Sequence, residues 1–365
     1  MKASYFKFLF ATIAVLGFAG CDDNEGDSQV DTELNAQILE AFSANVAQAS
    51  YNDLKSKAAE LNDDIENLAA SGGKTAANLE ACRTSWKAAR ASWEQTESFL
   101  FGPVSTEDVD PRIDTWPVDF NVLEAQLDSN NDFTPEYIDE LLEDQKGFHA
   151  IEYLIFGAEG TKSAENITDR ELEFLTALGT NLKNLTAQVA DGWNPAVDGN
   201  YHELFVDAGN GSTSYETQQD AFAELVGAMA GICDEVANGK INEVYEAKDP
   251  TMEESPFSQN SITDFKYNMI GVRNVYLGKY SADGKGLEDL VRKHNLQLDG
   301  QIKAAIDAAI SALNNITDPF GEAITSQPVQ VENAVEAINA LGALLDDGDD
   351  LVNTDLAGFV VLHTK

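Results

Sequence analysis

From Thr32 almost to its C-terminus, the chain repeats apolar residues at the spacing of an α-helix. In the first such segment they recur about every 3.6 positions, as Leu34, Ile38, Phe42, Val46, Ala49 and Leu54. A helix places residues three and four apart on one face, so this pattern predicts long amphipathic helices that pack against one another. The sequence therefore predicts an all-α fold.

Glycine and proline mark where the predicted helices end. The first helix ends at Ser-Gly-Gly, 71–73, and the second at Phe-Gly-Pro, 101–103, because Gly suits a helix C-cap and Pro cannot continue a helix. Further helices are expected at about 121–128, 135–144, 147–156, 169–191, 215–238, 261–277, 286–313 and 328–345. Only the tail GFVVLHTK, 358–365, indicates a β-strand.

A chain of 365 residues exceeds the size at which one hydrophobic core usually stops growing. The segment 191–213 is rich in Gly, Asn, Pro and Asp, which is typical of a domain junction. We therefore expect two helical bundles that face each other, an N-terminal domain at 33–200 and a C-terminal domain at 201–365. The long Pro- and Asp-rich loop at 102–120 is either functional or poorly ordered.

The N-terminus has the features of a secretory signal peptide at 1–20. Two lysines precede a mostly apolar run at 8–18, which is too short for an ordinary membrane span. The small residues before Cys21 resemble the lipobox of bacterial lipoproteins, with Phe18 where Leu is usual. We expect Cys21 to carry the lipid and the acidic segment 21–32 to form a tether, which places the protein in the cell envelope, at the outer membrane, on its periplasmic or surface face.

The net charge of the chain indicates which classes of partner it can bind. The chain has 23 Lys and Arg against 63 Asp and Glu, a formal charge of -40, which would repel nucleic acid. Beyond the lipid-bearing cysteine, Cys82 and Cys233 either form a disulfide or remain buried free thiols.

The stretch GFHAIEYLIFG, 147–157, holds one histidine and one glutamate in an apolar helix. His149 and Glu152 are three residues apart, so their side chains are neighbours and can reach one ion. Imidazole and carboxylate together suit zinc or iron. The same spacing also fits an ordinary helix-surface pair, but the apolar flanks imply burial, and a buried ionisable group needs a partner.

The second predicted helix offers partners for this pair. Glu94 and Glu97 are again three residues apart, and two such helices side by side could bring one histidine and three carboxylates to a shared metal. In the alternative, Glu94 pairs with Arg90 one turn earlier and Glu97 faces water.

Four blocks carry a family resemblance: WKAARASWEQTESFLFGP, DPRIDTWPVDF, GFHAIEYLIFG and ESPFSQNSITDFKYNMIGVRNVYLG. In order and spacing they resemble the imelysin-like proteins, the M75 peptidase or insulin-cleaving membrane protease-like family, which includes the iron-regulated protein A type. The resemblance runs from about Asp31 to the C-terminus, with the GxHxxE signature at Gly147, His149 and Glu152. It implies a two-domain helical fold with a site at the domain interface, and a link to bacterial iron uptake.

The resemblance also implies site residues. His149 and Glu152 are the signature pair, and the other matching positions are Glu94, Glu97, Asp114, Trp116, Ser255, Ser258, Asp264 and Arg273. Several have structural alternatives. The serines and Asp264 could cap the helix that begins near 261, Arg273 could form an interdomain ion pair, and Trp116 could be a packing anchor.

The sequence holds no complete catalytic motif. HExxH and GxSxG are absent, and no histidine adjoins Cys82 or Cys233. We therefore expect a lipid-anchored protein that binds iron, zinc or another metal, or an iron-bearing small ligand, and that works with envelope iron-uptake proteins. A zinc-dependent peptidase of the M75 type is the alternative. In a third interpretation, His149 and Glu152 bind no metal and only fix helix packing.

Overall fold

The computed structural model describes residues 31–348 and 354–364. All the regular secondary structure of these residues is helical, and they contain no β-strand. The all-α prediction is therefore confirmed for this part of the chain. The predicted signal peptide, Cys21 and nearly all of the tether lie outside the described residues. None of the helices in the described ranges is both long and apolar enough to cross a membrane.

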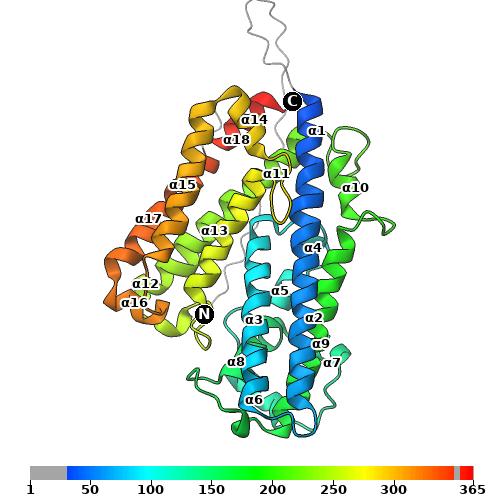
Figure 1. Ribbon diagram of the computed structural model, residues 1–365, viewed down its shortest axis with the longest axis vertical. Helices are drawn as coiled ribbons and strands as arrows, with labels where there is room; N and C mark the ends of the chain where they lie inside the picture. The colour runs from blue at the N-terminus through cyan, green and yellow to red at the C-terminus, as the bar shows by residue number, and fades with distance from the viewer. Residues whose placement is uncertain (1–30, 349–353, 365) are drawn as a thin grey trace, which may run out of the picture.

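Three long helices dominate the first half of the chain. Helix α1 (Thr32–Ala41) continues through a π-helical segment, Phe42–Gln48, into α2 (Ala49–Ala69). Helices α3 (Ala76–Thr96) and α9 (Asp169–Gly192) both pack against α2 (Figure 1). We call these helices and the short ones packed on them the first group.

The first group also includes short helices. Helix α8 (Gly147–Phe156) packs against both α3 and α9. The others are α4 (Pro103–Thr106), α5 (Asp110–Ile113), α6 (Phe120–Leu127), α7 (Pro135–Asp139) and α10 (Tyr201–Val206). The first two of these lie in the predicted Pro-rich loop, so that loop is partly helical.

The second half of the chain forms a neighbouring group of helices, seen on the left of Figure 1. Its long members are α11 (Gln218–Asp234), α13 (Ser261–Leu277), α15 (Leu296–Asn314) and α17 (Pro328–Leu345). Its shorter members are α12 (Val244–Ala247), α14 (Leu287–His294), α16 (Phe320–Ser326) and α18 (Leu356–His363). A π-helical segment, Glu235–Glu243, joins α11 to α12. We call these elements the second group.

Helices α3 and α13 pack together along the seam between the two groups. Gly271 allows this approach, because a Cβ there would lie 2.4 Å from the carbonyl oxygen of Gln95 and 2.7 Å from Oγ of Ser98. Buried apolar side chains form one cluster through both groups, from Trp86 and Phe148 to Phe265. The boundary between domains at 200 and 201 stays a prediction.

The structure corrects two details and settles one alternative. The predicted strand at the tail is wrong, since α18 begins there with Asp355 accepting a hydrogen bond from the Gly358 N–H at 2.7 Å. The single helix predicted at 286–313 is wrong as well, because the chain leaves helical geometry at Asn295. Cys82 and Cys233 are buried free thiols, so the disulfide interpretation is wrong.

Candidate functional site

Helix α8 brings the signature histidine against the loop that carries Asp114. Gly147 at the start of α8 has a φ of 75°, and a Cβ there would lie 2.2 Å from the carbonyl oxygen of Ile113. Only glycine fits this contact. Two residues further on, His149 is fully buried, and so is Glu152.

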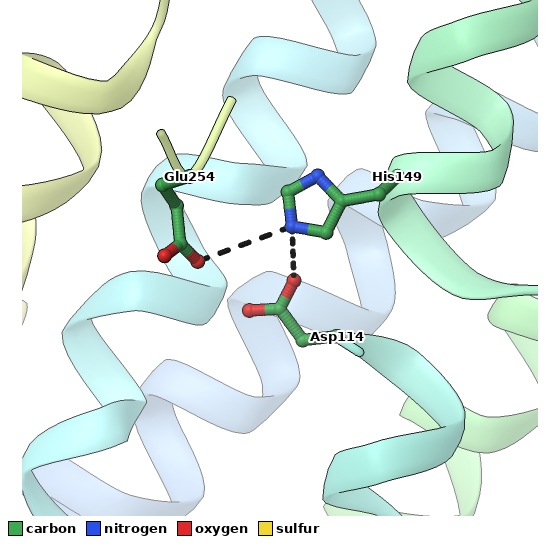
Figure 2. Close-up of side chains that lie close together, drawn as sticks. All are labelled: Asp114, His149 and Glu254. Atoms are coloured by element: carbon green, nitrogen blue, oxygen red, sulfur yellow. Dashed lines mark ion pairs between the residues drawn. The ribbon is translucent and has the colours of Figure 1, made fainter. Parts of the chain in front are cut away.

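The two ring nitrogens of His149 face different partners. Nδ1 lies 3.0 Å from Oε2 of Glu152. Nε2 lies 3.1 Å from Oδ1 of Asp114 and 3.9 Å from Oε1 of Glu254, and Figure 2 shows both carboxylates on this side of the ring. Neither contact of Nε2 has hydrogen-bond geometry, so this buried nitrogen has no hydrogen-bond partner among the described residues.

Glu152 is held by the second group. Its Oε1 accepts hydrogen bonds from the backbone N–H of Ser258 at 2.8 Å and from the Ser258 hydroxyl at 2.6 Å. With both oxygens engaged, Glu152 orients the imidazole of His149 from the Nδ1 side, so that Nε2 faces Asp114 and Glu254. Carboxylates play this role behind metal-binding histidines.

Asp114 is the carboxylate on the Nε2 side. It forms an ion pair with Arg90, and its Oδ2 accepts a hydrogen bond from Nε1 of Trp93 at 2.6 Å. Burial disfavours its ionisation, but the charge of Arg90 and the close contact with His149 outweigh burial and hold the pKa of Asp114 well below its ordinary value. Asp114 is therefore ionised at neutral pH.

Arg90 is fully buried among carboxylates. Besides Asp114, it pairs with Glu94 on its own helix, with Glu254 at 3.3 Å and with Asp264 at 3.7 Å. The predicted alternative pairing of Glu94 with Arg90 is therefore present, and it lies inside the cluster rather than on a surface.

Glu94 and Glu97 both accept hydrogen bonds from the side-chain amide of one residue of the second group, Asn268. Asn268 of α13 donates to Oε2 of Glu94 at 2.7 Å and to Oε2 of Glu97 at 2.6 Å. Lys240, from the π-helical segment of the second group, lies 3.0 Å from Oε2 of Glu97 and 3.4 Å from Oε1 of Glu254. The interpretation in which Glu97 faces water is wrong, because its side chain is buried.

Several carboxyl groups of the cluster hold their protons strongly. Burial raises the pKa of Glu94 well above its ordinary value, that of Glu97 to about 8 and that of Asp264 to about 6. For His149, burial opposes protonation, but the contact with the Asp114 carboxylate and the hydrogen bond with Glu152 outweigh it and raise its pKa to about 9. A cation bound among these groups would displace their protons, because its charge would compensate the buried carboxylates.

The remaining predicted residues have different positions. The Ser255 hydroxyl donates to Oδ2 of Asp264 at 2.7 Å. The N-cap of α13 is Asn260 without a side-chain cap bond, so neither serine caps this helix. Arg273 lies more than two turns beyond Asp264 on α13, is half-buried, and has no ion pair or hydrogen bond with the rest of the described chain.

Trp116 lines the approach to this cluster. Its ring lies 5.1 Å from that of His149, between centroids, and its Nε1 donates to the Met252 carbonyl oxygen at 3.3 Å. Beside it is a hollow of about 660 Å³, which Asp114 and Glu254 also line. The site therefore has a route to solvent.

Two sets of side chains could hold a metal ion. Asp114, His149 and Glu254 each offer an atom, all within 4.8 Å of one another, and so do Glu94, Glu97 and Asp114. The first set fits zinc or iron best, because it joins one imidazole to two carboxylates and includes the unpartnered Nε2. Arg90 and Lys240 pair with the same carboxylates, so an ion would compete with them for these oxygens.

Three residues of the cluster were not predicted. Glu254 is the first residue of the fourth matching block, and Asn268 lies one helical turn after Asp264 on a face that is otherwise apolar. The spacing of Asp264 and Asn268 on one helix face could have identified Asn268, whereas Glu254 lies outside the helices and has no such signal. Lys240 carries no such signal, because its segment is polar and contains nothing that points to the cluster.

Comparisons with known proteins agree with the motifs. A family model described as imelysin, peptidase M75, matches residues 47–347. A protein named iron-regulated protein A, from Synechococcus elongatus, is 32% identical over 287 residues, which cover 77% of this chain and 76% of that protein.

Solved structures share the fold. One, described as a candidate iron-regulated protein A precursor from Parabacteroides distasonis, has a TM-score of 0.79 and 27% identity, and covers 88% of this chain and 95% of that one. An imelysin-like protein from Psychrobacter arcticum has a TM-score of 0.67 at 11% identity, covering 86% of this chain and 93% of that one. At that identity the second likeness concerns the fold alone.

Proposed function

The chain belongs to the imelysin family, peptidase M75, and from this premise we propose that it binds iron or a related divalent metal between its two groups of helices and serves iron uptake. The name of its relative, iron-regulated protein A, supports the link to iron. In this proposal the metal is cargo, captured at Asp114, His149 and Glu254.

One observation carries the proposal. Nε2 of His149 is fully buried and has no hydrogen-bond partner in the described structure, yet two carboxylates lie within 4 Å of it. An unsatisfied buried nitrogen is costly unless something binds it. Glu152 and Ser258 fix the ring so that this nitrogen points at the two carboxylates.

Calorimetric titration with Zn²⁺, and with Fe²⁺ without oxygen, tests the proposal. The His149→Ala change should weaken binding at least about 100-fold, since losing even an outer partner of a metal ligand costs 10–100-fold. Glu152→Gln should weaken it by about 10-fold or more for the same reason. His202→Ala is the matched control, because His202 contacts Ser43, outside the cluster.

Equal affinities of the wild type and His149→Ala, or no binding by either, would contradict the proposal. If His149→Ala does not fold, Glu254→Gln provides the same test, because it removes one carboxylate charge and keeps the shape of the side chain. In the third interpretation, where the pair only fixes packing, His149→Ala lowers the melting temperature and wild-type metal binding stays at background.

A zinc-dependent peptidase of the M75 type is the second candidate. It is favoured by the hollow beside the three-ligand set, which a peptide side chain could enter. Cleavage of an unfolded polypeptide, measured with and without a chelator, distinguishes it. Absent or chelator-insensitive cleavage would exclude this candidate and leave the binding proposal intact.

We also propose that a lipid on Cys21 anchors the protein to the outer membrane, where it would pass its cargo to envelope iron-uptake proteins. The small residues before this cysteine and the acidic segment after it support the proposal. Cys21→Ser should move the protein from the membrane fraction to the soluble fraction. Continued membrane association of this variant would argue against the anchor.

A further inference from the structure

The hollow beside the site is much larger than a metal ion needs. Its volume is about 660 Å³, whereas one water molecule takes about 30 Å³ of liquid. Pockets for small organic molecules span about 300–1,000 Å³. The size therefore fits an ion that arrives with an organic ligand.

One wall of the hollow is apolar. Leu100, Trp116, Pro117, Phe120 and Met252 line it, and the side chains of Phe120 and Met252 are 40% and 43% exposed. Large apolar side chains exposed together at a hollow are typical of a ligand-binding surface.

Edge-to-face contacts between aromatic rings hold this wall in place. The Phe257 ring lies 6.1 Å from that of Trp116, 5.6 Å from that of Phe120 and 5.5 Å from that of Tyr153, between centroids. Since Phe257 itself is buried, it anchors rings on both sides. The wall is thus preformed rather than a set of loose surface side chains.

The rest of the lining is mainly acidic. Glu97, Asp110, Asp114, Glu235, Glu243 and Glu254 line the hollow, and Lys240 is the one basic residue among the described residues that line it. Such a lining repels an anionic ligand and accepts an uncharged or cationic one.

We propose that the cargo is a metal chelate, in which an uncharged or cationic organic carrier fills the coordination positions that Asp114, His149 and Glu254 leave open. The apolar body of the carrier lies against Trp116, Phe120 and Met252. This inference rests on the proposed function, because it assumes that the metal binds at His149.

The test uses zinc with carriers of different charge. Calorimetry measures the binding of three forms of zinc to the full chain: Zn²⁺ alone, its preformed one-to-one complex with 2,2′-bipyridine, and its complex with citrate. Bipyridine is an uncharged, aromatic carrier, whereas citrate is an anionic carrier. The bipyridine complex should bind at least tenfold more tightly than zinc alone and change the tryptophan fluorescence. The citrate complex should bind more weakly than zinc alone, because citrate competes for the metal and is repelled.

Variants of the wall separate the carrier from the metal. Phe120→Ala and Met252→Ala should lose most of the advantage of bipyridine while binding zinc alone as the wild type does. The control is Leu142→Ala, which removes an apolar side chain that is 64% exposed and does not line the hollow.

The outcomes distinguish failure of the proposed metal binding from failure of the carrier inference. If zinc does not bind in any form, the proposed function fails. If zinc binds alone and bipyridine weakens it, or if the wall variants keep the full advantage, the proposed function stands and the carrier inference is overturned.

Discussion

At the scale of single residues, Glu171 links stability to pH. It completes a capping box with Thr168 at the start of α9, accepting from the Thr168 N–H at 2.7 Å, and it pairs with Lys162. Burial alone would raise the pKa of Glu171, but the bonds from Lys162 and Thr168 outweigh it and hold the pKa below its ordinary value of 4.5. Ionised Glu171 therefore contributes stability above about pH 4.5, which is lost as the pH falls through its folded pKa.

Glu171→Gln should lower the free energy of unfolding by about 1 kcal/mol at pH 7, because glutamine keeps the capping bond but loses the ion pair. The difference from the wild type should shrink steadily below pH 4.5. Urea unfolding at pH 7, 5, 4 and 3 measures both. The control Glu173→Gln breaks an exposed pair with Arg170 and should change stability by less than about 0.5 kcal/mol. A difference for Glu171→Gln that stays constant with pH would refute the assignment.

The residues of the site show which contacts the sequence spacing can predict. The spacing of His149 and Glu152 correctly predicted that the two side chains contact each other, and the apolar flanks correctly predicted burial. Spacing could not predict that Glu152 turns to Ser258 while Nε2 turns to Asp114 and Glu254. That division depends on which elements pack on each side of α8, which is a property of the tertiary structure.

At the scale of elements, the contact between α3 and α13 depends on one missing side chain. Gly271→Ala places a Cβ 2.4 Å from a backbone oxygen of the 3₁₀-capped end of α3, so the helices must separate, at a cost of about 1–3 kcal/mol. Gly231→Ala, on the exposed face of α11 with nothing within 4 Å, should instead stabilise by about 0.5–1 kcal/mol. Thermal unfolding compares the two. If both substitutions change the stability in the same direction, the close packing of α3 against α13 at Gly271 does not limit the stability of the protein.

The predicted elements were most accurate where the amphipathic pattern was long. Helices α9, α13 and α17 have nearly the predicted bounds. The tail failed because a short apolar run fits a strand and a buried helix equally well, and its packing against α11 and α17 decides the outcome. The break at Asn295 was missed because this residue acts as an N-cap, accepting from the Leu298 N–H at 3.0 Å, inside a periodic run.

At the scale of the whole molecule, each helix group contains one buried thiol. Cys82 is on α3 and Cys233 on α11, both fully inaccessible to solvent, and burial raises the pKa of each thiol to about 12. In a Cys21→Ser background, both should react with a thiol reagent at least about 10³-fold more slowly than in the unfolded chain. Because one apolar cluster runs through both groups, we expect both to become reactive at the same urea concentration. Single-cysteine variants measure each rate, and an earlier reaction at one thiol would show that its group opens independently.

The wide spacing of the site along the chain also has a consequence for the time course of synthesis. His149 and Asp114 are made in the first half of the chain, whereas Glu254 and Asn268, which complete the cluster, come much later. A ribosome must therefore translate most of the message before the centre can exist. The emerging polypeptide therefore cannot hold cargo at this centre until much of the second half of the chain has been made.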